Sequence, residues 1–122
     1  MYRNFAIVPR IIFGRGCFNQ LDDILKPKRT PGGHMVFVMD DVFAGNPLEK
    51  RIPLAGRDYV LPVNVADEPK TSYIDKLVAV IKAKGQGVPE GIIGIGGGST
   101  LDIAKAVSLL LTNPGSAADY QG

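Results

Sequence analysis

Three consecutive glycines, Gly96, Gly97 and Gly98, stand between a short apolar run and a segment with helical character. The apolar run covers 91–95 and predicts a buried strand, and Ser99 begins the predicted helix. Glycine has no Cβ, so backbone N–H groups in such a turn can approach an anion closely, and the unpaired N–H groups of a helix start add positive partial charge. The segment therefore predicts a phosphate-binding turn at the carboxyl end of a strand.

Apolar runs alternate with helical patterns along the rest of the chain. The continuous apolar run 35–39 ends in Asp40 and predicts a strand buried on both faces. The segment 59–65 predicts a strand at an edge or bulge of the sheet, because it contains Pro62. Strands that alternate with helices indicate an α/β fold with a parallel sheet. An apolar stripe at helical spacing lies between two of these strands and consists of Ile74, Leu77, Val78 and Ile81.

The first third of the chain shows weaker patterns. The runs 5–8 and 11–13 are β-type and predict an N-terminal strand pair or two strands of one edge. Residues 17–25 have apolar side chains at helical spacing and predict a helix, with Lys26-Pro27 as its stop. The next residues, 26–33, include two prolines and two glycines and predict a loop without a regular element.

The helix that carries the apolar stripe has recognisable ends. Ser72 and Asp75 resemble a capping box at its start. Lys82 lies in its last turn, where a cation suits the helix dipole, and Gly85 suits the C-terminal cap. His34, the single histidine, follows a glycine and is expected to be a surface loop residue.

Composition excludes several functional classes. With 122 residues, 45% of them hydrophobic and 21% charged, the chain fits one globular domain. A net charge of +2 gives no case for nucleic acid or for an acidic membrane surface as a partner. No apolar stretch approaches about 18 residues, and the N-terminus lacks a secretory pattern. One cysteine and one histidine exclude an internal disulfide, a multi-cysteine zinc site and a triple-histidine metal site, so cytoplasmic residence is expected.

The glycine segment differs from the two commonest nucleotide-binding patterns. A G-x-G-x-x-G pattern that begins at Gly94 has Ser99 in place of the third glycine, and no strand-end acid follows about 20 residues later. No Gly-Lys-Ser/Thr follows the glycines, as a P-loop requires. Taken as a bare pattern, the segment leaves two hypotheses open: an anion cradle, and a tight turn with a capped helix and no ligand.

Residues 96–105, GGGSTLDIAK, match the pattern GGGSxxDxAK and resemble the iron-containing (group III) alcohol dehydrogenases. The FGRG segment at 13–16 and the strand that ends in Asp40 are also similar to that family, so the resemblance covers nearly the whole chain. It implies a Rossmann-like parallel sheet flanked by helices over residues 1–122, as the N-terminal NAD(P)-binding domain of a metal-dependent dehydrogenase or oxidase. A non-catalytic phosphate- or nucleotide-binding module is the alternative hypothesis.

The resemblance also implies roles for individual residues. The glycines and Ser99 would hold the pyrophosphate of the cofactor. Asp40 would accept hydrogen bonds from the adenosine ribose and favour NAD over NADP, or it is a plain strand-end turn residue. Asp102, expected in the first turn of the helix, would stabilise the helix dipole or face the nicotinamide. The cofactor-binding residues implied in this way are Asp40, Gly96, Gly97, Gly98, Ser99 and Asp102.

In the family, a helical C-terminal domain supplies an aspartate and three histidines that bind Fe²⁺ or Zn²⁺. The resemblance therefore implies that the metal ligands lie outside this chain, which is expected to be truncated and inactive alone. It assigns no catalytic residue. The segments 67–75 and 112–116 resemble the branch of the family that oxidises the C8 hydroxyl of the sugar acid 3-deoxy-D-manno-octulosonate in bacterial lipopolysaccharide synthesis. A small alcohol or sugar acid is the implied substrate, and a homo-oligomer the implied assembly.

Overall fold

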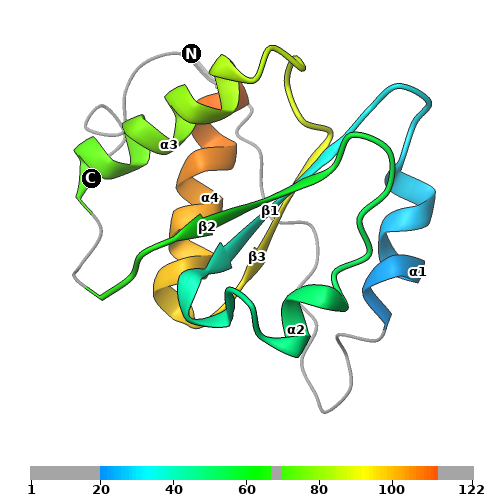
Figure 1. Ribbon diagram of the computed structural model, residues 1–122. Helices are drawn as coiled ribbons and strands as arrows, with labels where there is room; N and C mark the ends of the chain where they lie inside the picture. The colour runs from blue at the N-terminus through cyan, green and yellow to red at the C-terminus, as the bar shows by residue number, and fades with distance from the viewer. Residues whose placement is uncertain (1–19, 67–69, 113–122) are drawn as a thin grey trace.

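A three-stranded parallel sheet forms the centre of the protein (Figure 1). The computed structural model describes residues 20–66 and 70–112. The strands are β1 (Met35–Asp40), β2 (Tyr59–Val63) and β3 (Gly91–Ile95), and their order in the sheet is β2-β1-β3. A parallel sheet with helices packed on it confirms the predicted α/β, Rossmann-like architecture.

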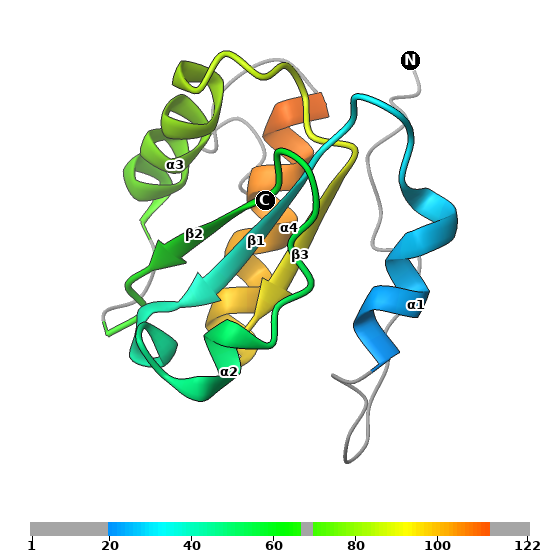
Figure 2. The ribbon, with the colours of Figure 1, turned by 45° about the vertical axis from the view of Figure 1, so that its right-hand side comes forward.

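Helices cover both faces of this sheet. The two longer helices, α3 and α4, lie together on one face (Figure 1), and α1 lies across the strands from them (Figure 2). The remaining helices among the described residues are short. The helices are α1 (Leu21–Leu25), η2 (Lys26–Lys28), η3 (Asp41–Phe43), α2 (Pro47–Lys50), α3 (Thr71–Ala83) and α4 (Gly98–Thr112), where η marks a 3₁₀ helix.

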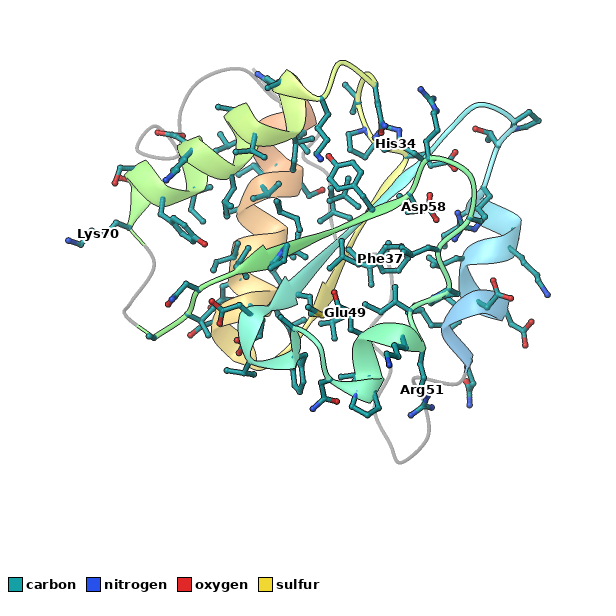
Figure 3. All side chains as sticks on the ribbon, in the orientation of Figure 1. His34, Phe37, Glu49, Arg51, Asp58 and Lys70 are labelled. Atoms are coloured by element: carbon teal, nitrogen blue, oxygen red, sulfur yellow. The ribbon has the colours of Figure 1, made fainter. Side chains whose placement is uncertain are left out.

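The central strand β1 belongs to two hydrophobic cores at once. Its side chains alternate between the faces of the sheet, so Val36 and Val38 pack with α3 and α4. Met35, Phe37 and Met39 point to the other face and pack with α1 and the connection after β1. Figure 3 shows Phe37 in this position. All five side chains are at most 1% exposed. The predicted strand buried on both faces is confirmed.

The strand register places the carboxyl ends of β1 and β3 side by side. Met39 is level with Ile95 on one side, and Asp40 is level with Val63 on the other. The strand predicted at 59–65 ends two residues earlier, at Val63. Its Pro62 is exposed on an outer strand of the described sheet. Along the edge of this strand that faces no described strand, the missing N–H removes no ladder hydrogen bond.

One prediction about the segment before β1 is confirmed and one is wrong. Helix α1 ends at Leu25, as the predicted stop at Lys26-Pro27 requires, and a 3₁₀ turn at Lys26–Lys28 follows it with the proline in its first positions. Proline is tolerated there, since its missing N–H has no helical acceptor. Consequently the predicted loop 26–33 begins with a regular turn. The residues of the predicted helix before position 20, and the predicted strand pair at 5–8 and 11–13, lie outside the described residues.

The ends of α3 differ from the prediction at one terminus and agree at the other. The four residues of the apolar stripe are buried against the sheet, as predicted. The helix begins one residue before Ser72, with Lys70 at the N-cap and no side-chain cap hydrogen bond, so the predicted capping box is wrong. Gly85 has a φ of +69° directly after the C-cap Lys84, which is the conformation that favours glycine at a helix end.

His34 is buried, which overturns its prediction as a surface residue. Only 1% of its surface is exposed, and its ring stacks on Tyr59 with the centroids 6.2 Å apart. Its backbone carbonyl accepts a hydrogen bond of 2.9 Å from the N–H of Glu90. Burial raises the pKa of the Tyr59 phenol, and the Lys84 ammonium lies 4.6 Å from the ring centroid. These residues lie at the amino ends of the strands.

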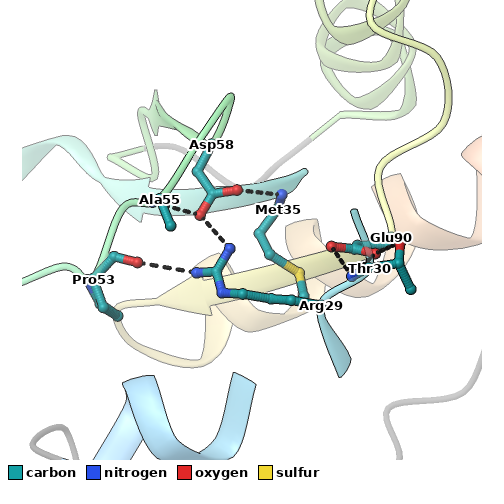
Figure 4. A network of polar contacts seen from close by, with 7 residues as sticks. All are labelled: Arg29, Thr30, Met35, Pro53, Ala55, Asp58 and Glu90. Atoms are coloured by element: carbon teal, nitrogen blue, oxygen red, sulfur yellow. Dashed lines mark hydrogen bonds and ion pairs between the residues drawn. The ribbon is translucent and has the colours of Figure 1, made fainter. Parts of the chain in front are cut away.

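A buried carboxylate fixes the start of β1 (Figure 4). The Asp58 side chain is fully buried and accepts hydrogen bonds from Met35 N at 2.8 Å and Ala55 N at 3.0 Å. Its other partner is the guanidinium of Arg29, at 2.7 Å, which also donates to Pro53 O at 3.0 Å. Asp58 thus joins the segment before β1 to the segment before β2, so the two strands start at a defined register.

A second carboxylate ties the same segment to β3. Glu90, which directly precedes β3, accepts hydrogen bonds from Thr30 N at 3.0 Å and from Thr30 Oγ1 at 2.7 Å (Figure 4). Unlike the Asp58 contact, this one is exposed to solvent. The amino end of the sheet is therefore held by side-chain hydrogen bonds to all three described strands.

We expect Asp58→Ala to lower the free energy of unfolding by about 3–5 kcal/mol, because it leaves Arg29 and two backbone N–H groups without their acceptor. Urea unfolding followed by circular dichroism measures the loss. The matched control is Asp22→Ala, which breaks an exposed pair with Lys26 and should cost less than about 1 kcal/mol. Equal losses in the two variants would contradict the role of Asp58.

Candidate functional site

The candidate site lies at the carboxyl ends of β1 and β3. The two strands are neighbours in the sheet, although β2 comes between them in the sequence. The connections that leave β1 and β3 therefore diverge at this point, and ligands of open α/β sheets bind in the crevice that such a divergence creates. Asp40 ends one strand, and the glycine turn follows the other.

Gly96 makes the closest approach at this end of the sheet. Its φ is +154°, a conformation that residues with a Cβ rarely adopt. A Cβ added there would stand 2.8 Å from Thr100 Cβ and 3.1 Å from Asp40 Cβ. Position 96 is therefore restricted to glycine by its neighbours as well as by its backbone. The turn brings β1, β3 and the first turn of α4 together.

Gly97 and Gly98 face open space instead. A Cβ added at either residue would meet no atom within 4 Å, and both residues are exposed. Helix α4 begins at Gly98, one residue before the predicted start at Ser99. The first intrahelical hydrogen bond is donated by Leu101 N to Gly97 O at 3.1 Å, so the N–H groups before Leu101 have no acceptor within the helix. The open glycines and these N–H groups form a surface to which an anion can bind.

Asp40 lies beside this surface and already has one structural role. Its Oδ1 accepts a hydrogen bond of 3.1 Å from Val42 N and caps the short helix η3. This is the strand-end turn role that the sequence left as an alternative. An ionised carboxylate accepts about four hydrogen bonds. The cap therefore leaves the carboxylate able to bind ligand hydroxyls as well.

The remaining predicted residues lie further along α4. Ser99 is exposed in the first turn, next to the open glycines. Asp102 is exposed but lies beyond the first turn, because the helix begins at Gly98 rather than at Ser99. Its predicted place in the first turn is therefore wrong, and its contribution near the dipole end is weakened.

Thr100 was not predicted from the sequence. It is fully buried in the first turn of α4, and among the described residues its Oγ1 has no hydrogen-bond partner. Oγ1 lies 2.5 Å from the position that a Cβ on Gly96 would occupy. A single hydroxyl in a helix gives no sequence signal, since threonine is common on exposed and buried helix faces alike.

The described residues form no metal site and no membrane span. Within 20–66 and 70–112, no group of three or more His, Cys, Asp or Glu side chains could hold a metal ion. Among the helices in this part of the chain, none is long and apolar enough to cross a membrane. The glycine turn offers backbone N–H groups and a hydroxyl as hydrogen-bond donors, which suit a phosphate. The neighbouring carboxylate is a hydrogen-bond acceptor, which suits sugar hydroxyls.

The chain belongs to the iron-containing alcohol dehydrogenase family, whose model matches residues 9–122. It is 30% identical over 124 residues to an NAD-dependent methanol dehydrogenase from Bacillus methanolicus, covering 98% of this chain. It is 32% identical over 119 residues to alcohol dehydrogenase 4 from Saccharomyces cerevisiae, covering 97% of this chain. The chain spans 31% of the length of each of these relatives.

A solved structure supports the fold. The crystal structure of sulfoacetaldehyde reductase from Bifidobacterium kashiwanohense, in complex with NAD⁺, superposes with a TM-score of 0.68. The match covers 100% of this chain and 32% of the reductase, at 23% sequence identity. The Rossmann-like arrangement of sheet and helices is thus shared with this structure.

We expect Gly96→Ala to destabilise the fold by about 1–3 kcal/mol, because the added Cβ meets Thr100 and the backbone conformation is strained. Gly98→Ala is the matched control. Its Cβ enters open space within a helix, so the free energy of unfolding should stay level or rise by up to about 1 kcal/mol. Chemical unfolding of both variants measures the difference. A loss of similar size in both would show that the turn is not restricted as described.

Proposed function

We propose that this chain is the nucleotide-binding part of a metal-dependent alcohol dehydrogenase or oxidase, and that its cofactor is NAD. The observation that carries the proposal is the open pair Gly97 and Gly98 at the start of α4, beside the strand-end carboxylate of Asp40. Membership of the iron-containing alcohol dehydrogenase family supports it. One relative is an NAD-dependent methanol dehydrogenase and the structural neighbour is in complex with NAD⁺, which favours this cofactor.

Different residues would bind the diphosphate and the ribose of the nucleotide. The N–H groups of Gly97 and Gly98 and the hydroxyl of Ser99 would donate hydrogen bonds to the diphosphate, whose charge the N-terminus of α4 also favours. Asp40 would accept hydrogen bonds from the two hydroxyls of the adenosine ribose. The same carboxylate would repel the 2′-phosphate of NADP. When bound, the cofactor supplies the hydride acceptor, and this chain supplies binding and orientation.

Asp40→Asn tests the choice of cofactor. The amide oxygen keeps the cap on Val42 N while the charge is removed, so the fold should be preserved. In the full-length protein, calorimetric titration should show weaker NAD⁺ binding and a ratio of NADP⁺ to NAD⁺ dissociation constants about tenfold smaller. Asp41→Asn, which removes a neighbouring exposed charge, should leave that ratio unchanged.

A second variant separates the diphosphate contact from the ribose contact. Gly98→Val puts a side chain where phosphate oxygens would approach, so both cofactors should lose at least about tenfold in affinity and their ratio should persist. The role of Asp40 is wrong if the wild-type protein already prefers NADP⁺. Unchanged cofactor affinity in Gly98→Val would contradict the proposal that the glycine turn binds the diphosphate.

Within the part of the chain that the structure describes, no ligand set suits the metal of the family. Residues 20–66 and 70–112 contain no group of three or more His, Cys, Asp or Glu side chains that could hold Fe²⁺ or Zn²⁺, so no metal ligand is proposed among them. The ligands would come from the remainder that the relatives possess, since this chain spans 31% of their length. Residues 1–122 would then be one domain of a larger enzyme.

We expect purified residues 1–122 to show no dehydrogenase or oxidase turnover with any alcohol and any divalent metal. Hydride transfer requires the alcohol carbon to be held against the nicotinamide, and a single domain leaves that cleft with one wall. Absorbance at 340 nm with NAD⁺ and a panel of alcohols measures turnover, with contaminating full-length enzyme excluded. Turnover by this chain would refute the proposal that residues 1–122 bind the nucleotide but need the rest of the enzyme for catalysis. Nucleotide binding without turnover in the full-length protein would favour the non-catalytic module.

The substrate we propose is the C8 hydroxyl of 3-deoxy-D-manno-octulosonate, a sugar acid of lipopolysaccharide synthesis. The support is the resemblance of 67–75 and 112–116 to the branch of the family that oxidises it. Steady-state kinetics of the full-length protein would compare this sugar acid with methanol, ethanol and sulfoacetaldehyde, and a higher kcat/KM for a simple alcohol would overturn the choice. Cytoplasmic residence and a homo-oligomeric assembly stay predictions.

A further inference from the structure

Thr100 combines complete burial with an unused hydrogen-bonding group. It is 0% exposed, and among the described residues no atom pairs with its Oγ1. The side chain packs directly under the glycine turn, with Oγ1 2.5 Å and Cβ 2.8 Å from the place of a Cβ on Gly96. The orphaned hydroxyl therefore lies on the buried side of the backbone whose outer side forms the proposed phosphate site.

A purely structural role does not explain the hydroxyl. Valine has nearly the same shape and would fill the same space without burying a polar group that lacks a partner. A threonine hydroxyl in a helix commonly donates to a backbone carbonyl three or four residues earlier. In Thr100 that acceptor would be Gly96 O or Gly97 O, and neither bond is formed. Buried polar groups without a partner are uncommon, and departures from such local rules are expected at functional or strained sites.

The peptide between Gly96 and Gly97 links the hydroxyl to the site. In a trans peptide the C=O of one residue and the N–H of the next point in opposite directions. When the Gly97 N–H turns outward to an anion, the Gly96 C=O turns inward, to the side on which Thr100 Oγ1 lies. Both residues are glycines without a Cβ, so this rotation meets little steric resistance.

We propose that Thr100 is a positioning residue of the nucleotide site: its hydroxyl donates to the Gly96 carbonyl when a diphosphate binds, and so holds the Gly97 N–H toward the phosphate. The proposal rests on the proposed nucleotide-binding function. Thr100 does not touch the nucleotide, because it is buried beneath the turn. In the free protein the hydroxyl lowers stability, and in the complex it strengthens binding.

Two substitutions separate this role from packing. Thr100→Val removes the donor and keeps the volume, so the free protein should unfold at a higher temperature while binding of ADP and NAD⁺ weakens about tenfold. Thr100→Ser keeps the donor and loses a methyl group, so it should unfold at a lower temperature yet bind within about twofold of the wild type. Stability should therefore rank Val above Thr above Ser, and Val should bind more weakly than both. A packing role would make affinity follow stability.

The experiment is calorimetric titration and thermal unfolding of the full-length protein, with ADP and NAD⁺ as probes. Thr71→Val, the same change at the start of α3, is the control and should leave affinity unchanged. Wild-type affinity in Thr100→Val, or lower stability of that free variant, overturns the role of Thr100 alone. Absence of binding by the wild type overturns the proposed function and this inference with it.

Discussion

The contact between Gly96 and its two neighbours, Asp40 and Thr100, determines the geometry of the candidate site. It joins the end of β1, the end of β3 and the first turn of α4 at distances that exclude any side chain on Gly96. Because the backbone of the turn lies against Asp40 Cβ, the strand-end carboxylate and the open glycines lie next to each other. The distance between the strand-end carboxylate and the start of α4 depends on this approach.

The two ends of the sheet are stabilised in different ways. At the amino end, Asp58 and Glu90 connect the strands through side-chain hydrogen bonds, and His34 and Tyr59 are packed together. At the carboxyl ends of β1 and β3, the close backbone approach at Gly96 is joined by the local cap from Asp40 to Val42 N, and the glycines of the turn are exposed. Side chains larger than glycine in this turn would occupy the space that the proposed ligand needs.

Features that depend on local periodicity were predictable from the sequence. The buried run 35–39, the apolar stripe of α3 and the glycine turn each correspond to a pattern that neighbouring residues impose on one another. His34 was mispredicted because its burial comes from Tyr59 and Glu90, which lie far along the chain. The predicted capping box of α3 and the predicted position of Asp102 in α4 were wrong for a related reason. Each helix begins one residue earlier than the sequence predicted, and both predictions were counted from the predicted start.

The bond from Asp40 to Val42 N explains how one residue can serve both the fold and the site. The cap fixes the carboxylate while the protein folds, so its orientation is already set before any ligand arrives. A flexible acid at the same position would lose rotational freedom on binding, which costs about 0.5–1.5 kcal/mol for a side chain that is immobilised. The turn role and the ribose role are therefore not competing explanations of Asp40. The first is the physical reason that the second would be effective.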